Sequence, residues 1–173
     1  MTITAMTTAT APSRRVRTEA PDPTFVLHKI LVPVDFSAAS RNAHRYAMRF
    51  AAKFGAELTL LYVLTPTPML SVAGISVAGS DGSDRATAEE NLREMAGPSR
   101  NGASIKTRCV TRPGVPSHEI VEFAKESGTD LIVMATHGYT GWKHFCIGST
   151  AERVVRAAPC PVMVVREKEH ELV

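Results

Sequence analysis

The stretch HKILVPVD, residues 28–35, is the strongest structural signal in the chain. Its apolar residues Ile30, Leu31, Val32 and Val34 do not alternate with polar ones, as expected of a strand that is buried on both faces of a sheet. Such a strand needs helices on both sides, which is the arrangement of parallel sheets in α/β proteins. We therefore predict that the fold is organised around a parallel sheet containing this strand.

The residues that follow predict one βαβ unit. Ser37 is a suitable N-cap, and Gly55 is a suitable end for the helix between them. Apolar residues recur in this segment at three- and four-residue spacing: Ala43, Tyr46, Ala47, Phe50, Ala51 and Phe54. Residues 57–63, ELTLLYV, read as the second strand, so the crossover between the two strands should be right-handed.

Residues 64–83 interrupt this pattern. The segment contains Pro66, Pro68, Gly74, Gly79 and Gly82 and predicts a long loop, which is either a lid or an unconstrained insertion. Helical periodicity returns weakly over 84–96. The following strand, 104–111, alternates polar and apolar residues and should lie near a sheet edge.

The rest of the chain continues the alternation of helices and strands. Ser117 is expected to cap a short helix, and residues 130–135, DLIVMA, form a second doubly buried strand. A last helix begins near Gly148 and ends before Pro159, and residues 161–165, PVMVV, form the final strand. Five strands alternating with four helices predict a doubly wound α/β domain, but periodicity does not give the strand order.

The chain has 173 residues, which is enough for one such domain, over residues 27–167, with tails at 1–26 and 168–173. The net charge of +3 matches the three arginines at 14, 15 and 17 in the first tail, so the domain is about neutral and no nucleic-acid partner is expected. No apolar run is long enough to span a membrane. The first tail reads as a disordered extension or, with the same composition, as a transit peptide.

The cysteines favour a cytoplasmic location. Cys109, Cys146 and Cys160 are odd in number and far apart, and they match no zinc-site spacing. Free thiols in a reducing compartment fit this pattern best. No metal site is predicted.

The loop after the fourth strand is the best candidate for chemistry, because doubly wound sheets bind ligands beyond the carboxyl ends of their strands. Residues 135–150, ATHGYTGWKHFCIGST, contain three glycines, and hydroxyl residues follow the last of them at a helix start. Backbone N–H groups and the helix dipole would suit a phosphate there. Residues 149–152, STAE, also match a capping box, in which Ser149 and Glu152 satisfy the helix end themselves. The chain contains neither a GxxxxGK[ST] nor a GxGxxG motif.

Three separated blocks, VPVDFS at 32–37, ATHG at 135–138 and GSTAERVVRAAPCPVMVVR at 148–166, resemble the universal stress protein family. The resemblance covers residues 27–167. It implies a five-stranded parallel sheet in the order 3-2-1-4-5, with Asp35 and the loop at Gly138 facing one crevice.

ATP-binding members of that family carry the pattern G-x2-G-x9-G-[ST] after the fourth strand. The matching positions here are Ala135, Gly138, Gly148 and Ser149, so the spacing is intact but the first glycine is an alanine. If the backbone there needs a positive φ, alanine adds strain of about 1 kcal/mol or more, and its methyl group could crowd the ribose or phosphate. If φ is negative, the exchange is nearly harmless.

The resemblance also implies roles for single residues. Asp35 would accept hydrogen bonds from the ribose, although a carboxylate there can equally bond the following turn. For Val63 and Met134, core packing is the alternative to contact with the base. His137 and Asp35 together could at most orient water for slow hydrolysis. The complete set of predicted binding residues is Pro33, Val34, Asp35, Val63, Met134, Ala135, His137, Gly138, Gly148, Ser149 and Thr150.

Two functional hypotheses follow. The first is a nucleotide-binding regulatory protein of the stress response, with ATP, AMP or ADP as ligand, with or without Mg²⁺, and with an unidentified protein partner. It would have no catalytic residues. The second is an interaction module of the same family whose pocket no longer binds nucleotide. In either case the apolar strand 161–165 is expected to pair with a second copy in a homodimer, as the resemblance implies and as exposed apolar edges require.

Overall fold

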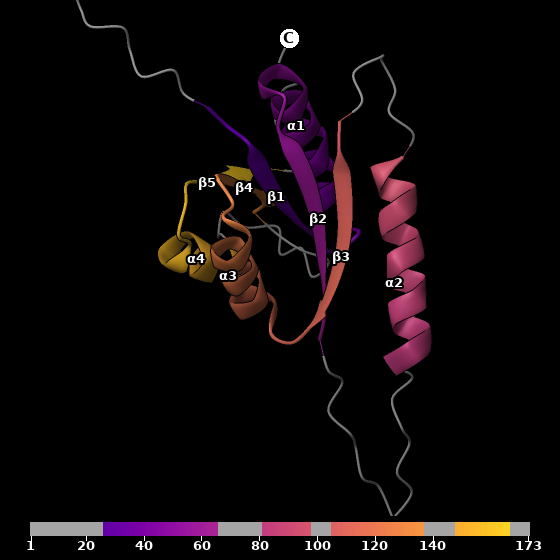
Figure 1. Ribbon diagram of the computed structural model, residues 1–173. Coiled ribbons are helices and arrows are strands. Elements are labelled where there is room, and N and C mark those ends of the chain that lie inside the picture. The colour runs from indigo at the N-terminus through magenta and orange to yellow at the C-terminus, as the bar shows by residue number, and fades with distance from the viewer. Residues whose placement is uncertain (1–25, 66–80, 98–104, 137–147, 167–173) are drawn as a thin grey trace, which may run out of the picture.

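The computed structural model describes residues 26–65, 81–97, 105–136 and 148–166, and it contains a parallel sheet in the order β3-β2-β1-β4-β5 (Figure 1). This is the strand order implied by the family resemblance, with β1 at the centre. The strands are β1 Lys29–Val34, β2 Glu57–Leu64, β3 Thr107–Pro113, β4 Leu131–Ala135 and β5 Val162–Val165.

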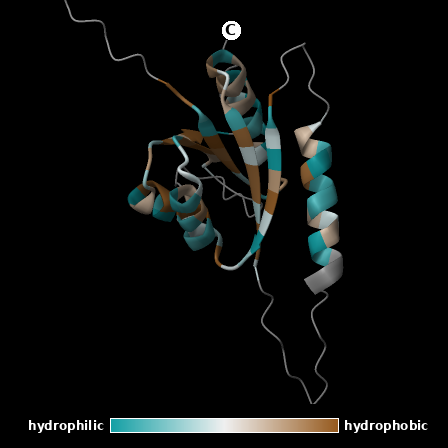
Figure 2. Cartoon of the chain, viewed as in Figure 1, coloured by the Kyte–Doolittle hydropathy of each residue, from teal (hydrophilic) through white to brown (hydrophobic). Residues whose placement is uncertain are grey.

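Helices cover both faces of the sheet. They are α1 Ala38–Phe54, α2 Asp81–Ala96, α3 Pro116–Ser127 and α4 Ser149–Ala157. One buried cluster joins α1 and α2 to one face, and a second joins α3 and α4 to the other. Figure 1 shows α3 and α4 together on one side of the strands, and Figure 2 shows apolar strands between helices whose surfaces are largely hydrophilic.

The central strand explains why its apolar run is continuous. Ile30, Val32 and Val34 belong to the cluster under α1 and α2, whereas Leu31 belongs to the cluster under α3 and α4. Successive side chains of a strand point to opposite faces, so both parities must be apolar when helices cover both. The prediction of a doubly buried strand is confirmed.

Both predicted ends of α1 are confirmed. The Ser37 hydroxyl oxygen accepts a hydrogen bond from the Ser40 amide at 3.1 Å, which satisfies one of the free donors at the start of the helix. At the other end Gly55 has φ 68, a left-handed conformation that glycine adopts without steric cost, and its amide bonds the Ala51 carbonyl. The chain then enters β2 directly.

Two sequence predictions need correction. Ser117 does not cap α3: Val115 is the N-cap and Pro116 is the first helical residue. Proline suits that position because its φ is fixed near helical values and the amide it lacks would have no partner there. The third strand lies at the sheet edge as predicted, but it runs over Thr107–Pro113 and so extends two residues beyond the predicted end.

Several predictions fall outside the described residues. These are the disorder of the 1–26 extension (all but its last residue), the choice between lid and insertion for most of 64–83, and the 168–173 tail. The helix predicted over 84–96 is present and begins earlier, at Asp81.

Candidate functional site

The chain leaves β1 through a strained turn. Phe36 has φ 63 and is the only non-glycine residue with a positive φ in the described part of the chain. A side chain in this left-handed region costs roughly 1–2 kcal/mol. Immediately before it, Asp35 Oδ1 accepts a hydrogen bond from the Ser37 amide at 3.1 Å. The turn-bonding alternative for Asp35 is therefore present in the structure.

The start of α4 is arranged differently from the capping box that the sequence predicts. Gly148 is the N-cap, it has no side chain to cap the helix, and no side-chain hydrogen bond replaces one. Ser149 is the first helical residue, and Glu152 bonds Arg156 instead, with 2.9 Å between Oε1 and Nη2. The capping-box prediction is wrong because the helix begins one residue too early, at Ser149 itself, so that Gly148 and not Ser149 takes the N-cap position. Within the described residues, no side chain caps the first amides of α4, which also have no intrahelical partner.

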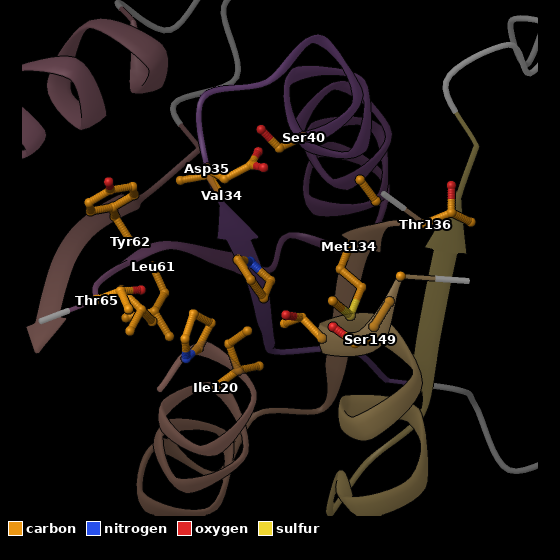
Figure 3. Close-up of a pocket in the computed structure, with 17 residues that line it drawn as sticks. Val34, Asp35, Ser40, Leu61, Tyr62, Thr65, Ile120, Met134, Thr136 and Ser149 are labelled. Carbon is orange, nitrogen blue, oxygen red and sulfur yellow. The ribbon is translucent and has the colours of Figure 1, made fainter. Parts of the chain in front are cut away.

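These two features meet at one cavity of about 430 Å³ (Figure 3). Its floor is formed by the carboxyl ends of β1, β2 and β4, and its walls by the first turns of α1, α3 and α4. In Figure 3, Asp35 lies at the tip of β1, while Met134 and Ser149 lie on the side of β4 and α4. The volume falls within the range of small-molecule sites, roughly 300–1,000 Å³.

The structure places most of the predicted binding residues around this cavity. Those that line it are Pro33, Val34, Asp35, Val63, Met134, Ala135, Gly148, Ser149 and Thr150. His137 and Gly138 lie outside the described residues, so the proposed pairing of His137 with Asp35 stays a prediction. The role of each lining residue as a ligand contact likewise stays a prediction.

Eight further lining residues were not in the predicted binding set, although Thr65 and Thr136 directly follow strands whose ends the sequence analysis considered. They come from α1, β2, α3 and α4 and from the positions after β2 and β4: Ser40, Leu61, Tyr62, Thr65, Pro116, Ile120, Thr136 and Ala151. Two of them could have been found from strand register. Leu61 and Tyr62 are the β2 partners of Pro33 and Val34, so a site at the end of β1 must include them. Pro116 and Ile120 belong to α3, and their place at the cavity depends on tertiary packing that periodicity does not give.

The cavity has opposite polarity at its two ends. Asp35 is the only formally charged residue among the described lining residues. At the α4 end the charge is partial, because the aligned peptide dipoles of a helix are equivalent to about half a positive charge at its start. No group of three or more metal-ligating side chains occurs in the described residues. The cavity therefore offers hydrogen-bond acceptors at one end and anion-binding donors at the other.

Ala135 imposes no backbone strain. It is the last residue of β4, paired with Val165 of β5, and its φ is not among the positive ones. Ala135 is one of the residues that line the cavity, and it also packs against the core cluster under α1 and α2. Of the two objections to alanine at this position, the conformational one is removed and only the steric one remains.

Among the helices that the structure describes, none is long and apolar enough to cross a membrane.

The family model and the most similar curated proteins point to the same family. The model of the universal stress protein family matches residues 27–166. A universal stress protein of Methanocaldococcus jannaschii is 37% identical over 153 residues, which are 83% of this chain and 84% of that protein.

Solved structures agree with these relatives. The universal stress protein UspA from Lactobacillus plantarum is 30% identical with a TM-score of 0.63, covering 82% of this chain and 99% of its own. A universal stress protein solved in complex with cAMP is 22% identical with a TM-score of 0.63, covering 83% of this chain and all of its own.

Proposed function

This chain belongs to the universal stress protein family, and from that premise we propose that it is a regulatory protein that binds an adenine nucleotide in the cavity between Asp35 and the start of α4. ATP is the proposed ligand, with AMP and ADP as weaker alternatives and with Mg²⁺ bound through the nucleotide phosphates. The nucleotide acts as a switch whose bound state is recognised by a protein partner.

The observation that carries this proposal is the opposite polarity of the cavity's ends. A nucleotide has hydroxyl donors on its ribose, which suit the Asp35 carboxylate, and anionic phosphates, which suit the uncapped start of α4. The apolar residues between them, Val63 and Met134, suit the face of a purine base.

The relative that was solved with cAMP supports the choice of an adenine nucleotide. At 22% identity it supports the capacity of the fold, and the residues named above carry the argument for this chain. Cys109 and Cys160 are free thiols, which supports a cytoplasmic location as part of the same proposal.

The direct test is to heat-denature the purified protein, look for released adenine nucleotide by mass spectrometry, and titrate the ligand-free protein with ATP by calorimetry. Asp35→Asn should weaken ATP binding roughly 10- to 150-fold, because a hydrogen bond to a charged group contributes about 1.5–3 kcal/mol. Glu90→Gln, an exposed charge loss on α2, is the matched control and should change nothing.

A specific observation keeps the second function in view: Ala135, where the family pattern has glycine, is one of the residues that line the cavity. If no nucleotide is released and none binds at millimolar ATP, the chain acts as an interaction module without a nucleotide. The two functions are thus separated by one titration.

We further propose a homodimer through β5, which lies at one edge of the sheet. Its residue Val164 is only half-buried and belongs to neither core cluster, so it is free to contact a second copy. Val164→Lys should shift the protein to monomer in a sedimentation experiment, whereas Val155→Lys, an exposed position on α4, should not. Wild-type protein that sediments as a monomer at micromolar concentration would contradict the proposal.

A further inference from the structure

The turn between β1 and α1 is held in a conformation that its sequence does not favour. Phe36 has φ 63, and phenylalanine rarely adopts this region because its Cβ crowds the backbone. Strained residues persist only where surrounding contacts over-determine them, and they are often found at binding sites. The contacts of Phe36 therefore show which parts of the structure hold this turn in its left-handed conformation.

Two side chains hold Phe36 in place. Its ring stacks on the ring of Tyr62, with centroids 4.8 Å apart and planes inclined by 26°. The Arg41 guanidinium donates a hydrogen bond from Nη2 to the Phe36 carbonyl at 2.9 Å. The first contact ties the turn to β2 and the second ties it to α1, so the turn cannot relax without breaking one of them.

The same turn fixes Asp35. With Phe36 in the left-handed conformation, the Ser37 amide points back and donates to Asp35 Oδ1 at 3.1 Å. Tyr62 pairs with Val34 in the register of β1 and β2, which places it next to the end of β1. Tyr62 and Asp35 both line the cavity, and Figure 3 shows them on the same side of it.

We propose that the stacked pair Phe36–Tyr62 is a positioning device that holds the Asp35 carboxylate toward the cavity and thereby makes the site selective for ribonucleotides over deoxyribonucleotides. Tyr62 and Phe36 act through Asp35, whose ordered oxygen recognises a sugar hydroxyl. The selectivity rests on the proposed nucleotide function, but the positioning itself can be measured without any ligand.

The ligand-free test is hydrogen exchange of the Ser37 amide, which reports the bond to Asp35 directly. Tyr62→Ala and Phe36→Ala should each raise its exchange rate at least tenfold, and the double variant should add little, because the two residues form one contact. Tyr62→Phe keeps the stacked ring and should restore slow exchange. Phe50→Ala removes a ring from another stacked pair of α1, Phe50 and Phe54 at 6.2 Å, and should leave the Ser37 amide unchanged.

The ligand test compares ATP with 2′-deoxy-ATP and 3′-deoxy-ATP by calorimetry. Wild-type protein should bind at least one deoxy analogue tenfold or more weakly than ATP, as expected when a bond to a charged group is lost. Tyr62→Ala should reduce that ratio to less than about threefold by weakening ATP, while the affinity for the poorer analogue stays nearly constant. The Tyr62→Phe and Phe50→Ala variants should keep the wild-type ratio.

The outcomes are distinct. Equal weakening of all three nucleotides by Tyr62→Ala would show that Tyr62 contacts the ligand or merely supports the fold, and it would overturn the proposal, as would wild-type protein that does not distinguish the three. Wild-type protein that binds no nucleotide would overturn the proposed function and the selectivity with it. Unchanged Ser37 exchange in both alanine variants would overturn the positioning itself.

Discussion

Ala135→Gly introduces the glycine that the family resemblance implies for ATP binding, and we expect neither stability nor ATP affinity to increase. Ala135 ends β4 with its φ outside the positive region, so glycine relieves no strain. Glycine in a strand is less stable than alanine by roughly 0.5–1 kcal/mol because it loses more backbone entropy on folding. For a chain of this length that difference lowers the melting temperature by about 1–4 °C.

The effect on binding is also expected to be small. Ala135 is one of the residues that line the cavity of about 430 Å³, and loss of its methyl group leaves the hydrogen-bonding groups at both ends in place. The Kd for ATP should change less than about threefold, or roughly 0.65 kcal/mol, in a calorimetric titration. Ala135→Val, which adds bulk at the same point and suits a strand, should instead weaken ATP binding about tenfold or more.

A tighter complex would refute this reasoning. If Ala135→Gly binds ATP at least tenfold more tightly than wild type, or binds it when wild type does not, the methyl group obstructs the site. A rise in melting temperature would show that the backbone at Ala135 is strained after all.

Three further predictions test other parts of the structure. Ser37→Ala should lower the unfolding free energy by about 1 kcal/mol and Ser149→Ala by less than about 0.5, because only Ser37 caps its helix. Gly114→Ala should cost more than Gly55→Ala in urea unfolding, since a Cβ at Gly114 would lie 2.7 Å from the Glu119 side chain, whereas nothing lies within 4 Å at Gly55. Burial lowers the pKa of His44 below 6.5, so the unfolded state binds more protons just below that pH. The unfolding free energy of the wild-type protein should therefore decrease as the pH is lowered from about 7.5 to about 5.5. His44→Leu should make this decrease smaller.

The fold was largely predictable from the sequence because its strongest signals are local. The apolar run of β1 reflects helices on both faces, and Ser37 and Gly55 mark the ends of α1 through their own side-chain and backbone preferences. Strand order has no such local cause. It became available through the resemblance of three blocks to a known family, and the structure confirms it.

The errors in the sequence reasoning occur where two local signals compete. Ser117 is a good N-cap, but Pro116 before it is a better first helical residue, so α3 begins earlier. Ser149 and Glu152 have capping-box spacing, but Gly148 takes the cap position and Arg156 takes the carboxylate. Tyr62 was overlooked as a site residue because its place next to Asp35 depends on the register of β1 and β2.

Three helices begin at the cavity, and the different starts of α1 and α4 indicate which end suits an anion. Ser40 of α1 lines the cavity, but its amide is already bonded to the Ser37 hydroxyl, and its own hydroxyl donates to the Ser37 carbonyl at 3.1 Å. The acidic Asp35 stands beside that start and repels negative charge. The start of α4 has no side-chain cap, and Glu152, the acidic residue of its first turn, is paired with Arg156 and does not line the cavity. In the proposed complex the sugar should therefore lie toward α1 and the phosphates toward α4, because the reverse orientation would place two negative groups together, at Asp35, and would leave the dipole of α4 unused.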